Sequence, residues 1–343
     1  MQRRTIALTV ALGLALMVTS GVAVAQYKLT NLDSNVKGQA RYTDPLLVNG
    51  WGLVYGPGFP FWVSDAGSGW STIYNGGGVK QGLEVVVPSA NGRGPGSPTG
   101  IVFNGSQDFQ IQGSPAVFLF ATLDGTISGW APQSDLNNAI IAVDNSKSGA
   151  VYTGLAITSK TSGNLLYAAD VANNKVDVYD GNFTFVKSFT DTTLPAAFTP
   201  FGIQDINGLV YVAFADSTGG PGGFIDVFTE AGVLMGTLIK GAPLNQPWGI
   251  ALAPSNFGPL SNTLLVSNNI NNSGTINGFN PSNGHFVGTV KNDDDEPIHI
   301  DQLWGIEFGG GTPNDGATNE LFFTAGPGNN VAGTFGKITF RGE

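Results

Sequence analysis

Five turns of this chain carry a carboxylate or amide side chain at the same point, directly after an apolar segment. They are Asp65, Asp124, Asp170, Asp216 and Asn268. Four more oxygen-bearing side chains, Asp44, Asn49, Gln246 and Asp301, lie in segments that lead into apolar stretches. Carboxylate and amide oxygens are the ligands that Ca²⁺ and other hard cations take in proteins. Collected on one face, these residues would form a ligand-binding surface, with Asp65, Asp170, Asp216 and Asp301 as the metal candidates.

The same residue types have a structural role that needs no ligand. Asp and Asn side chains in tight turns accept hydrogen bonds from the backbone N–H groups that follow them. Taken singly, each of the aspartates fits this structural role, and metal binding is the alternative. The acidic run Asn292-Asp293-Asp294-Asp295-Glu296 lacks the Gly and the distal Glu of a calcium loop, which favours a solvated loop.

Catalytic motifs are weak. The chain has two histidines, and His299 lies two residues before Asp301. This spacing allows acid–base pairing, but the Ile-His-Ile-Asp context favours packing or a turn. The catalytic candidates are therefore Asp170, Asp301 and His299. The chain has no cysteine, no Gly-x-Ser-x-Gly elbow and no His-Glu-x-x-His sequence, which excludes thiolate chemistry and these hydrolase and zinc signatures.

A repeat of about fifty residues positions the polar turns. Each unit opens with a large or β-branched residue, then Gly, then Leu or Ile, and successive openings are 47 to 56 residues apart. The openings are Trp51-Gly52-Leu53, Thr99-Gly100-Ile101, Thr153-Gly154-Leu155, Phe201-Gly202-Ile203, Trp248-Gly249-Ile250 and Trp304-Gly305-Ile306. The glycine has a sufficient structural explanation, because a missing side chain lets strands approach closely around an axis. The three tryptophans would either pack between units or stack on a flat ligand.

Each opening is followed by further strand-like segments. Thr126–Trp130 and Thr275–Phe279 alternate β-branched, small and aromatic residues in nearly the same order, which is the pattern of a half-buried strand. The expected fourth segments are Leu83–Val87, Ala139–Val143, Phe185–Phe189, Val233–Ile239 and Phe286–Val290. The sixth unit has only three, and Tyr27–Leu32 is available as its outer strand. The sequence predicts an all-β, six-bladed β-propeller with four-stranded antiparallel blades, closed by its own two ends.

Tyr167-Ala168-Ala169-Asp170 with Asn173-Asn174-Lys175-Val176 resembles the NHL repeat. The chain after residue 25 is similar to a family of uncharacterised exported bacterial propellers, some with a PEP-CTERM tail. The segments that carry this are Asp44–Gly52, Phe61–Asp65, Ile300–Gly305, Leu321–Gly326 and Phe335-Gly336. The resemblance implies the fold and an exported location, but no known activity. Such a tail is not seen here, and Pro327-Gly328-Asn329-Asn330 stands where we expect an acidic turn.

Met1–Ala25 is predicted to be a signal peptide: Arg3 and Arg4 precede an apolar run that ends at Ala23-Val24-Ala25. An uncleaved anchor helix is the alternative. Cleavage before Gln26 would leave residues 26–343 as a single domain, secreted or periplasmic, and would move the net charge from −10 to −12. An acidic chain with 12% charged residues and no basic stripe is not expected to bind nucleic acid, and no other run is long or apolar enough to cross a membrane.

Two hypotheses from different classes follow. In the first, the protein is a monomeric binding or interaction module that takes a small molecule or a protein at the mouth of the channel. In the second, it is a Ca²⁺-dependent lactonase or esterase similar to gluconolactonase-type propellers, using Asp44, Asp65, Asp170, Asp216 and Asp301. There a channel-bound cation polarises the carbonyl group and a carboxylate acts as base.

Overall fold

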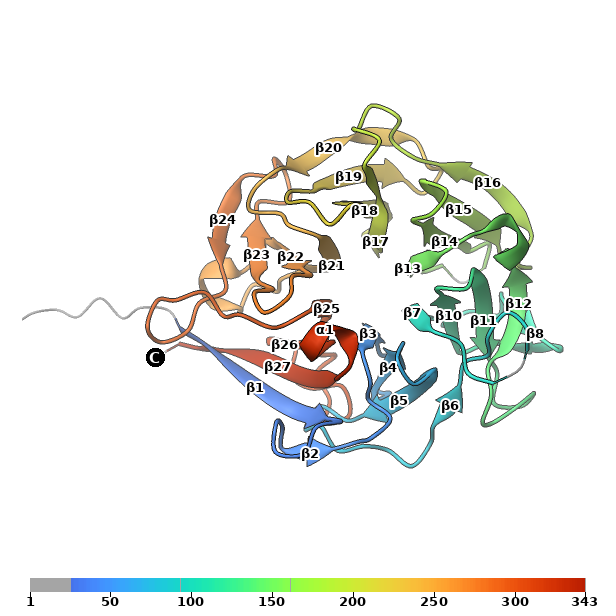
Figure 1. Ribbon diagram of the computed structural model, residues 1–343, viewed down its shortest axis with the longest axis horizontal. Coiled ribbons are helices and arrows are strands. Elements are labelled where there is room, and N and C mark those ends of the chain that lie inside the picture. Colours follow the sequence, from blue (N-terminus) through green and yellow to red (C-terminus); the bar gives the residue numbers. More distant parts are fainter. Residues whose placement is uncertain (1–25, 93, 161, 343) are drawn as a thin grey trace, which may run out of the picture.

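Six β-sheets surround a central axis in the computed structural model, which describes residues 26–92, 94–160 and 162–342 (Figure 1). Five sheets contain four strands in chain order, and the sixth joins both ends of the chain. The predicted six-bladed β-propeller is confirmed. The predicted signal peptide lies outside the described residues. Within the part of the chain that is described, no helix combines the length and the apolar character needed to cross a membrane.

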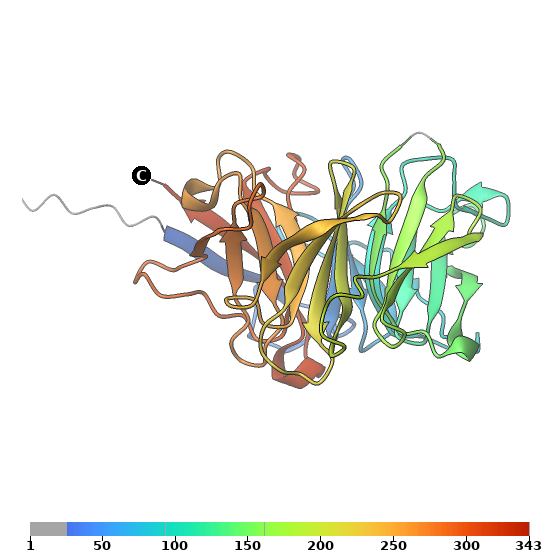
Figure 2. The same ribbon diagram turned by 90° about the horizontal axis from the view of Figure 1, so that it is seen from above.

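The first strand of each blade lies nearest the axis and the fourth forms the outer rim (Figures 1 and 2). Blade 1 contains β3 (Gly50–Val54), β4 (Phe61–Asp65), β5 (Trp70–Tyr74) and β6 (Val85–Val86). Blade 2 contains β7 (Pro98–Phe103), β10 (Phe118–Thr122), β11 (Thr126–Trp130) and β12 (Ile140–Asp144). A hairpin of β8 (Gln110–Ile111) and β9 (Ser114–Pro115) interrupts it. Blade 3 contains β13 (Tyr152–Ile157), β14 (Leu165–Asp170), β15 (Lys175–Asp180) and β16 (Phe185–Phe189).

The second half of the ring repeats this arrangement. Blade 4 contains β17 (Phe198–Ile206), β18 (Leu209–Asp216), β19 (Phe224–Thr229) and β20 (Leu234–Lys240). Blade 5 contains β21 (Pro247–Leu252), β22 (Leu264–Asn268), β23 (Ile276–Phe279) and β24 (Phe286–Thr289). Blade 6 contains β25 (Leu303–Phe308), β26 (Glu320–Ala325), β27 (Thr334–Arg341) and the N-terminal β1 (Gln26–Ser34). Short helical turns occur at Ser146–Ser148, Gly258–Leu260 and α1 (Pro327–Asn330).

The two ends of the chain close the ring, as the sequence predicts. Strand β1 runs antiparallel to β27, with Tyr27 opposite Phe340 and Leu29 opposite Ile338. A two-residue strand, β2 (Tyr42–Thr43), pairs in parallel with the end of β1. Blade 6 therefore reaches four strands only because its outer strand comes from the opposite end of the sequence.

Apolar side chains fill the six interfaces between blades. One cluster joins Leu265 and Ile276 of blade 5 to Ile306 and Phe323 of blade 6, and a corresponding cluster occupies each other interface. Alternating residues of one strand point to opposite faces of its sheet, so each blade contributes to the clusters on both sides. Burial of apolar surface between blades is thus the main stabilisation of the ring.

The glycine of each opening lies where neighbouring inner strands are closest. A Cβ atom on Gly52 would lie 2.3 Å from the Thr99 carbonyl oxygen, and one on Gly100 would lie 2.3 Å from the Leu155 nitrogen. Each contact joins one blade to the backbone of the next. These glycines therefore serve packing around the axis, which agrees with the structural interpretation of the repeat.

We expect Tyr27→Phe to lower the free energy of unfolding by about 1–3 kcal/mol. The buried Tyr27 hydroxyl donates to the Phe257 carbonyl oxygen at 2.7 Å and accepts from the Leu260 N–H at 3.3 Å, so its loss leaves two backbone groups of blade 5 without a partner. Urea unfolding measures the change. Tyr42→Phe is the control, because its hydroxyl makes no hydrogen bond among the described residues, and equal losses in both variants would contradict the prediction.

Candidate functional site

One face of the ring does collect the polar turns, as the repeat predicts. Asp65, Asp170, Asp216 and Asn268 are the last residues of β4, β14, β18 and β22. Asp124 departs from the pattern, because it lies two residues beyond the end of β10 and Thr122 takes the equivalent place. The α1 turn lies on the same face, which is the lower one in Figure 2. We call this the mouth face.

Donors from the local turns occupy these side chains. In the buried Asp170, Oδ1 accepts from the Val151 and Asn173 N–H groups at 3.1 and 3.2 Å, and Oδ2 accepts from Asn173 Nδ2 at 2.7 Å. Asp216 Oδ1 accepts from the N–H and hydroxyl of Thr218, and these bonds lower the pKa of Asp216. Such bonds fix the turn, so the structural role foreseen for these residues is present.

The other turns repeat this arrangement. Asp124 accepts from the Ala90 N–H and from the Thr122 hydroxyl. Asn268 is 2% exposed, with its oxygen accepting from the Asn245 N–H at 3.0 Å and its amide donating to the Pro243 carbonyl oxygen at 2.8 Å. In both residues the polar side-chain atoms are engaged by hydrogen bonds within the protein.

Asp44 and Asp65 are the two candidates that the structure brings together. Both are buried. Asp44 accepts from Tyr74 Oη at 2.7 Å and from Lys80 Nζ at 2.8 Å, while Asp65 Oδ2 accepts from Thr72 Oγ1 at 2.7 Å. Burial, with the nearby Asp44 charge adding to it, raises the pKa of Asp65 well above its usual value. The two carboxylates of this network are buried in blade 1, while Lys80 is partly exposed and also pairs with Glu84.

The residues that enter from the preceding segments support the channel mouth. Asn49 Oδ1 accepts from Trp304 Nε1 at 3.0 Å, and Gln246 Nε2 donates to the Asp216 carbonyl oxygen at 3.0 Å. Asp301 accepts from the Asn272 N–H at 2.6 Å and the Gly328 N–H at 2.8 Å, and so holds α1. His299 is exposed. Across the described ranges, no three His, Cys, Asp or Glu side chains are grouped so as to share a metal ion.

We expect Asp170→Asn to lower the free energy of unfolding by about 1 kcal/mol, because the new amide cannot accept the bond that Asn173 Nδ2 donates. Thermal melts at pH 7 measure this, with the exposed Asp294→Asn as control. A melt equal to that of the control would contradict a turn-fixing role for Asp170.

Aromatic side chains fill the channel at the mouth face. Trp51 of blade 1 stacks on Trp304 of blade 6 with ring centroids 3.7 Å apart, and it also contacts Phe201 of blade 4 at 6.5 Å and Trp248 of blade 5 at 6.4 Å. Blades 1 and 4 are opposite each other in the ring, so these contacts cross the axis. Trp248 Nε1 donates to the Thr153 carbonyl oxygen of blade 3 at 3.0 Å. We call Trp51, Phe201, Trp248 and Trp304 the plug; these tryptophans pack on one another across the axis.

The channel opens from the other face. There a cavity of about 190 Å³ is lined by Tyr55, Phe103, Ser159, Gln204, Asp205 and Glu307 together with apolar side chains. It narrows to a space of about 30 Å³ that ends at Trp248. Both parts share Leu53, Ile101, Gln204 and Glu307. We call the wider part, which is lined by Tyr55, Phe103, Ser159, Gln204, Asp205 and Glu307, the funnel.

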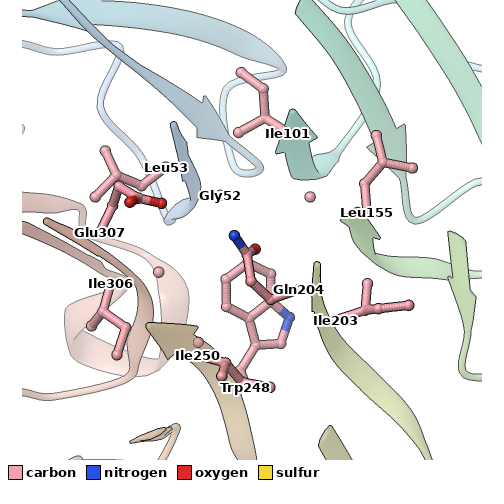
Figure 3. A pocket seen from close by; sticks show the side chains of 13 residues that line it. Gly52, Leu53, Ile101, Leu155, Ile203, Gln204, Trp248, Ile250, Ile306 and Glu307 are labelled. Carbon is pink, nitrogen blue, oxygen red and sulfur yellow. The ribbon is translucent and has the colours of Figure 1, made fainter. Parts of the chain in front are cut away.

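Gln204 and Glu307 are the polar side chains nearest the channel axis (Figure 3). The Gln204 amide lies near the middle of the ring of strands, and the Glu307 carboxylate extends inward from β25. Neither side chain forms a side-chain hydrogen bond or ion pair with another side chain in the described part of the chain. Burial raises the pKa of Glu307 to about 7, because protein atoms replace the water that would stabilise its charge.

Gln204 and Glu307 are not among the candidates predicted from the sequence, although the repeat contains a signal for them. The residue that follows each three-residue opening of the repeat is apolar in four blades, namely Val54, Val102, Ala156 and Ala251. In blades 4 and 6 it is Gln204 and Glu307. A polar residue at a repeat position that is otherwise apolar indicates that this side chain has a role other than packing.

Comparison with known sequences identifies relatives without a described function. The chain is 31% identical over 337 residues to the uncharacterised protein R648 of Acanthamoeba polyphaga mimivirus, covering 92% of this chain and 81% of that protein. It is 29% identical over 324 residues to protein L690 of the same virus, covering 88% and 83%. No family model matches the chain. The resemblance to exported bacterial propellers stays a prediction.

Solved structures share the fold. Virginiamycin B lyase from Staphylococcus aureus superposes with a TM-score of 0.54 at 16% identity, covering 92% of this chain and 99% of the lyase. The Xanthomonas campestris gluconolactonase XC5397 gives a TM-score of 0.55 at 12% identity, covering 86% and 88%. At these identities the likeness concerns the propeller architecture alone.

Proposed function

The chain belongs to the family of uncharacterised proteins that includes mimivirus protein R648, and we propose that it is a binding protein that holds a small molecule in its funnel. The observation that carries this proposal is a channel that is open at one end and closed at the other by the plug. Two polar side chains that line it, Gln204 and Glu307, have no side-chain partner in the described ranges. Pockets of this kind combine apolar walls with a few polar groups that orient a ligand. We place this activity after export, because residues 1–25 predict a signal peptide.

Binding is favoured over catalysis by the lining of the funnel. Among the residues that the structure describes, its ionisable groups are Tyr55, Asp205 and Glu307, with no His, Lys or Arg beside them. On the mouth face, where the sequence places the binding surface, hydrogen bonds within the protein already engage at least one oxygen of each aspartate, although the buried Asp65 Oδ1 has no partner among the described residues. A ligand there would have to break those bonds, whereas one in the funnel would add partners to Gln204 and Glu307.

A panel of small polar molecules tests the proposal through thermal melts and tryptophan fluorescence. A ligand at a hundredfold excess over its dissociation constant adds about 2.7 kcal/mol to the stability of the folded state. We expect binders to change the fluorescence of Trp248, which ends the channel, and to be weakened at least tenfold by Glu307→Gln or Gln204→Leu. Asp216→Asn on the mouth face is the matched control. Binders lost in Asp216→Asn or Asp301→Asn but retained in Glu307→Gln would move the site to the mouth face.

The second function is a Ca²⁺-dependent lactonase or esterase at the mouth face. The fold shared with a gluconolactonase favours it. Melts with EDTA and with added Ca²⁺, followed by a lactone and ester panel, separate the two functions. We expect no shift and no turnover. Turnover that requires Ca²⁺ and is lost in Asp301→Asn would establish the enzyme and overturn the binding proposal.

A further inference from the structure

We propose that the ligand of the funnel carries a cationic amine group that binds the Glu307 carboxylate. This inference rests on the proposed function and adds the chemical class of the ligand. The geometry behind it is a narrow, one-ended cavity in which Glu307 has no cationic side chain to pair with among the described residues. The funnel groups that can become charged near neutral pH are Asp205 and Glu307, and both become negative when they ionise, whereas burial keeps Tyr55 neutral by raising its pKa to about 12. The field inside the cavity therefore repels anions and attracts cations.

Glu307 gains more from a cation than a surface carboxylate would. It lies on β25 between Leu53 and Ile306, facing the space that narrows toward Trp248 (Figure 3). A carboxylate in such surroundings is costly until a charged partner satisfies it. An ammonium group supplies the opposite charge and three N–H donors, and charge-assisted hydrogen bonds of this kind are among the strongest in proteins.

The other residues that line the funnel can contact the remaining N–H groups and the alkyl chain of an amine. The Gln204 oxygen can accept a second N–H, and Asp205 Oδ2 is buried without a hydrogen-bond partner among the described residues. The rings of Tyr55 and Phe103 border the wider part, where aromatic faces attract cations. The 190 Å³ cavity has room for a short alkyl chain. Leu53, Ile101 and Ala156 provide apolar contacts for it.

A metal ion fits the funnel less well than an amine. A hard cation such as Ca²⁺ requires six to eight oxygen ligands, and nowhere in the described ranges do three His, Cys, Asp or Glu side chains meet for this purpose. An alkylammonium ion needs one carboxylate, one or two acceptors and an apolar wall, which the funnel supplies.

The test compares three probes that share one alkyl body and differ in the head group: butylamine, butan-1-ol and butyrate. Their binding to the mature protein is measured by calorimetry at pH 5.5, 6.5 and 7.5. We expect butylamine to bind at least tenfold more tightly than the other two at pH 7.5. Its affinity should rise more than tenfold from pH 5.5 to pH 7.5, because the Glu307 proton must leave before the ammonium binds. Glu307→Gln should remove both the preference and the pH dependence, while Asp216→Asn keeps them.

Three outcomes would overturn this inference. Equal or tighter binding of butan-1-ol or butyrate would show that the ligand is not an amine, while the proposed function stands. Displacement of butylamine by micromolar CaCl₂ would assign the funnel to a metal ion. Failure of all three probes and of the wider panel would overturn the proposed function together with the inference.

Discussion

The folded protein should be more stable at pH 5 than at pH 8, because buried carboxyl groups keep their protons close to neutrality. Burial raises the pKa of Asp226 to about 7, that of Glu307 to about 7 and that of Asp33 to about 6. In the unfolded chain these groups ionise near pH 4. Between the two values the folded state binds protons that the unfolded state has released. Stability is then greatest below pH 4 for these groups and falls as the pH rises through 6 to 7.

Asp226 is expected to contribute most. It is fully buried on β19, and neither of its oxygens accepts a well-formed hydrogen bond among the described residues, although the Thr237 hydroxyl lies beside it. Its charged neighbour is Asp191, which is 4% exposed and accepts from the Thr193 N–H and hydroxyl. A proton on Asp226 gives this pair a hydrogen bond instead of a repulsion. Loss of this proton above the pKa of Asp226 lowers the free energy of unfolding by on the order of a few kcal/mol.

Thermal melts from pH 5 to pH 8 at constant ionic strength measure the effect, and we expect a fall in Tm of roughly 5–10 °C. Asp226→Asn should flatten the curve, since an amide replaces the protonated acid and does not titrate. The control is Asp216→Asn, because the lowered pKa of Asp216 confines its contribution to pH values below about 4. A Tm that rises toward pH 8, or an unchanged slope in Asp226→Asn, would contradict the prediction.

The Gly202→Ala substitution should destabilise the ring by at least about 3 kcal/mol. A Cβ atom at this position would lie 1.9 Å from the Trp248 carbonyl oxygen and 2.7 Å from its carbonyl carbon. Both are backbone atoms of the inner strand of blade 5, so no side chain can move aside to relieve the contact. Blades 4 and 5 would have to separate at the axis, and Trp248 would shift within the plug.

Urea unfolding of Gly202→Ala measures this loss, and tryptophan fluorescence reports on the plug. Gly82→Ala is a matched control, because the position that a Cβ would take has no heavy atom within 4 Å from other described parts of the chain, and the φ of Gly82 is not positive. We expect little change or a small gain in the control, because alanine restricts the unfolded chain. Equal stability of the two variants would show that the inner strands tolerate a wider ring.

The repeat allowed the fold to be predicted because its signals are local. Alternation in Thr126–Trp130 and the turn residues after Leu165–Tyr167 specify strands and their connections within one blade. The role of β1 was also predictable, since a unit with three strands and an unused apolar segment must be completed from elsewhere. Even so, β6 (Val85–Val86) is shorter than the predicted Leu83–Val87.

The candidate site could be predicted only in part. The sequence placed Asp65, Asp170 and Asp216 on one face, but not the donors around them. Whether a carboxylate is free depends on neighbours such as Thr72 and Val151, which tertiary contacts bring to it. Glu307 shows the reverse case. It occupies a position that is apolar in four other blades, which marks it as unusual, but only the tertiary structure shows that it faces a channel.

By itself, the sequence of this protein determined the number of blades, their strand order and the closure of the ring, because periodic alternation and turn chemistry act over a few residues. Only the tertiary structure decided that the tryptophans meet across the axis and that the acids of the mouth face are already hydrogen-bonded. It also decided that the open end of the channel lies beside Gln204 and Glu307. Those features depend on contacts between blades that are far apart in the chain, where packing and the supply of hydrogen-bond donors are determined by the whole ring.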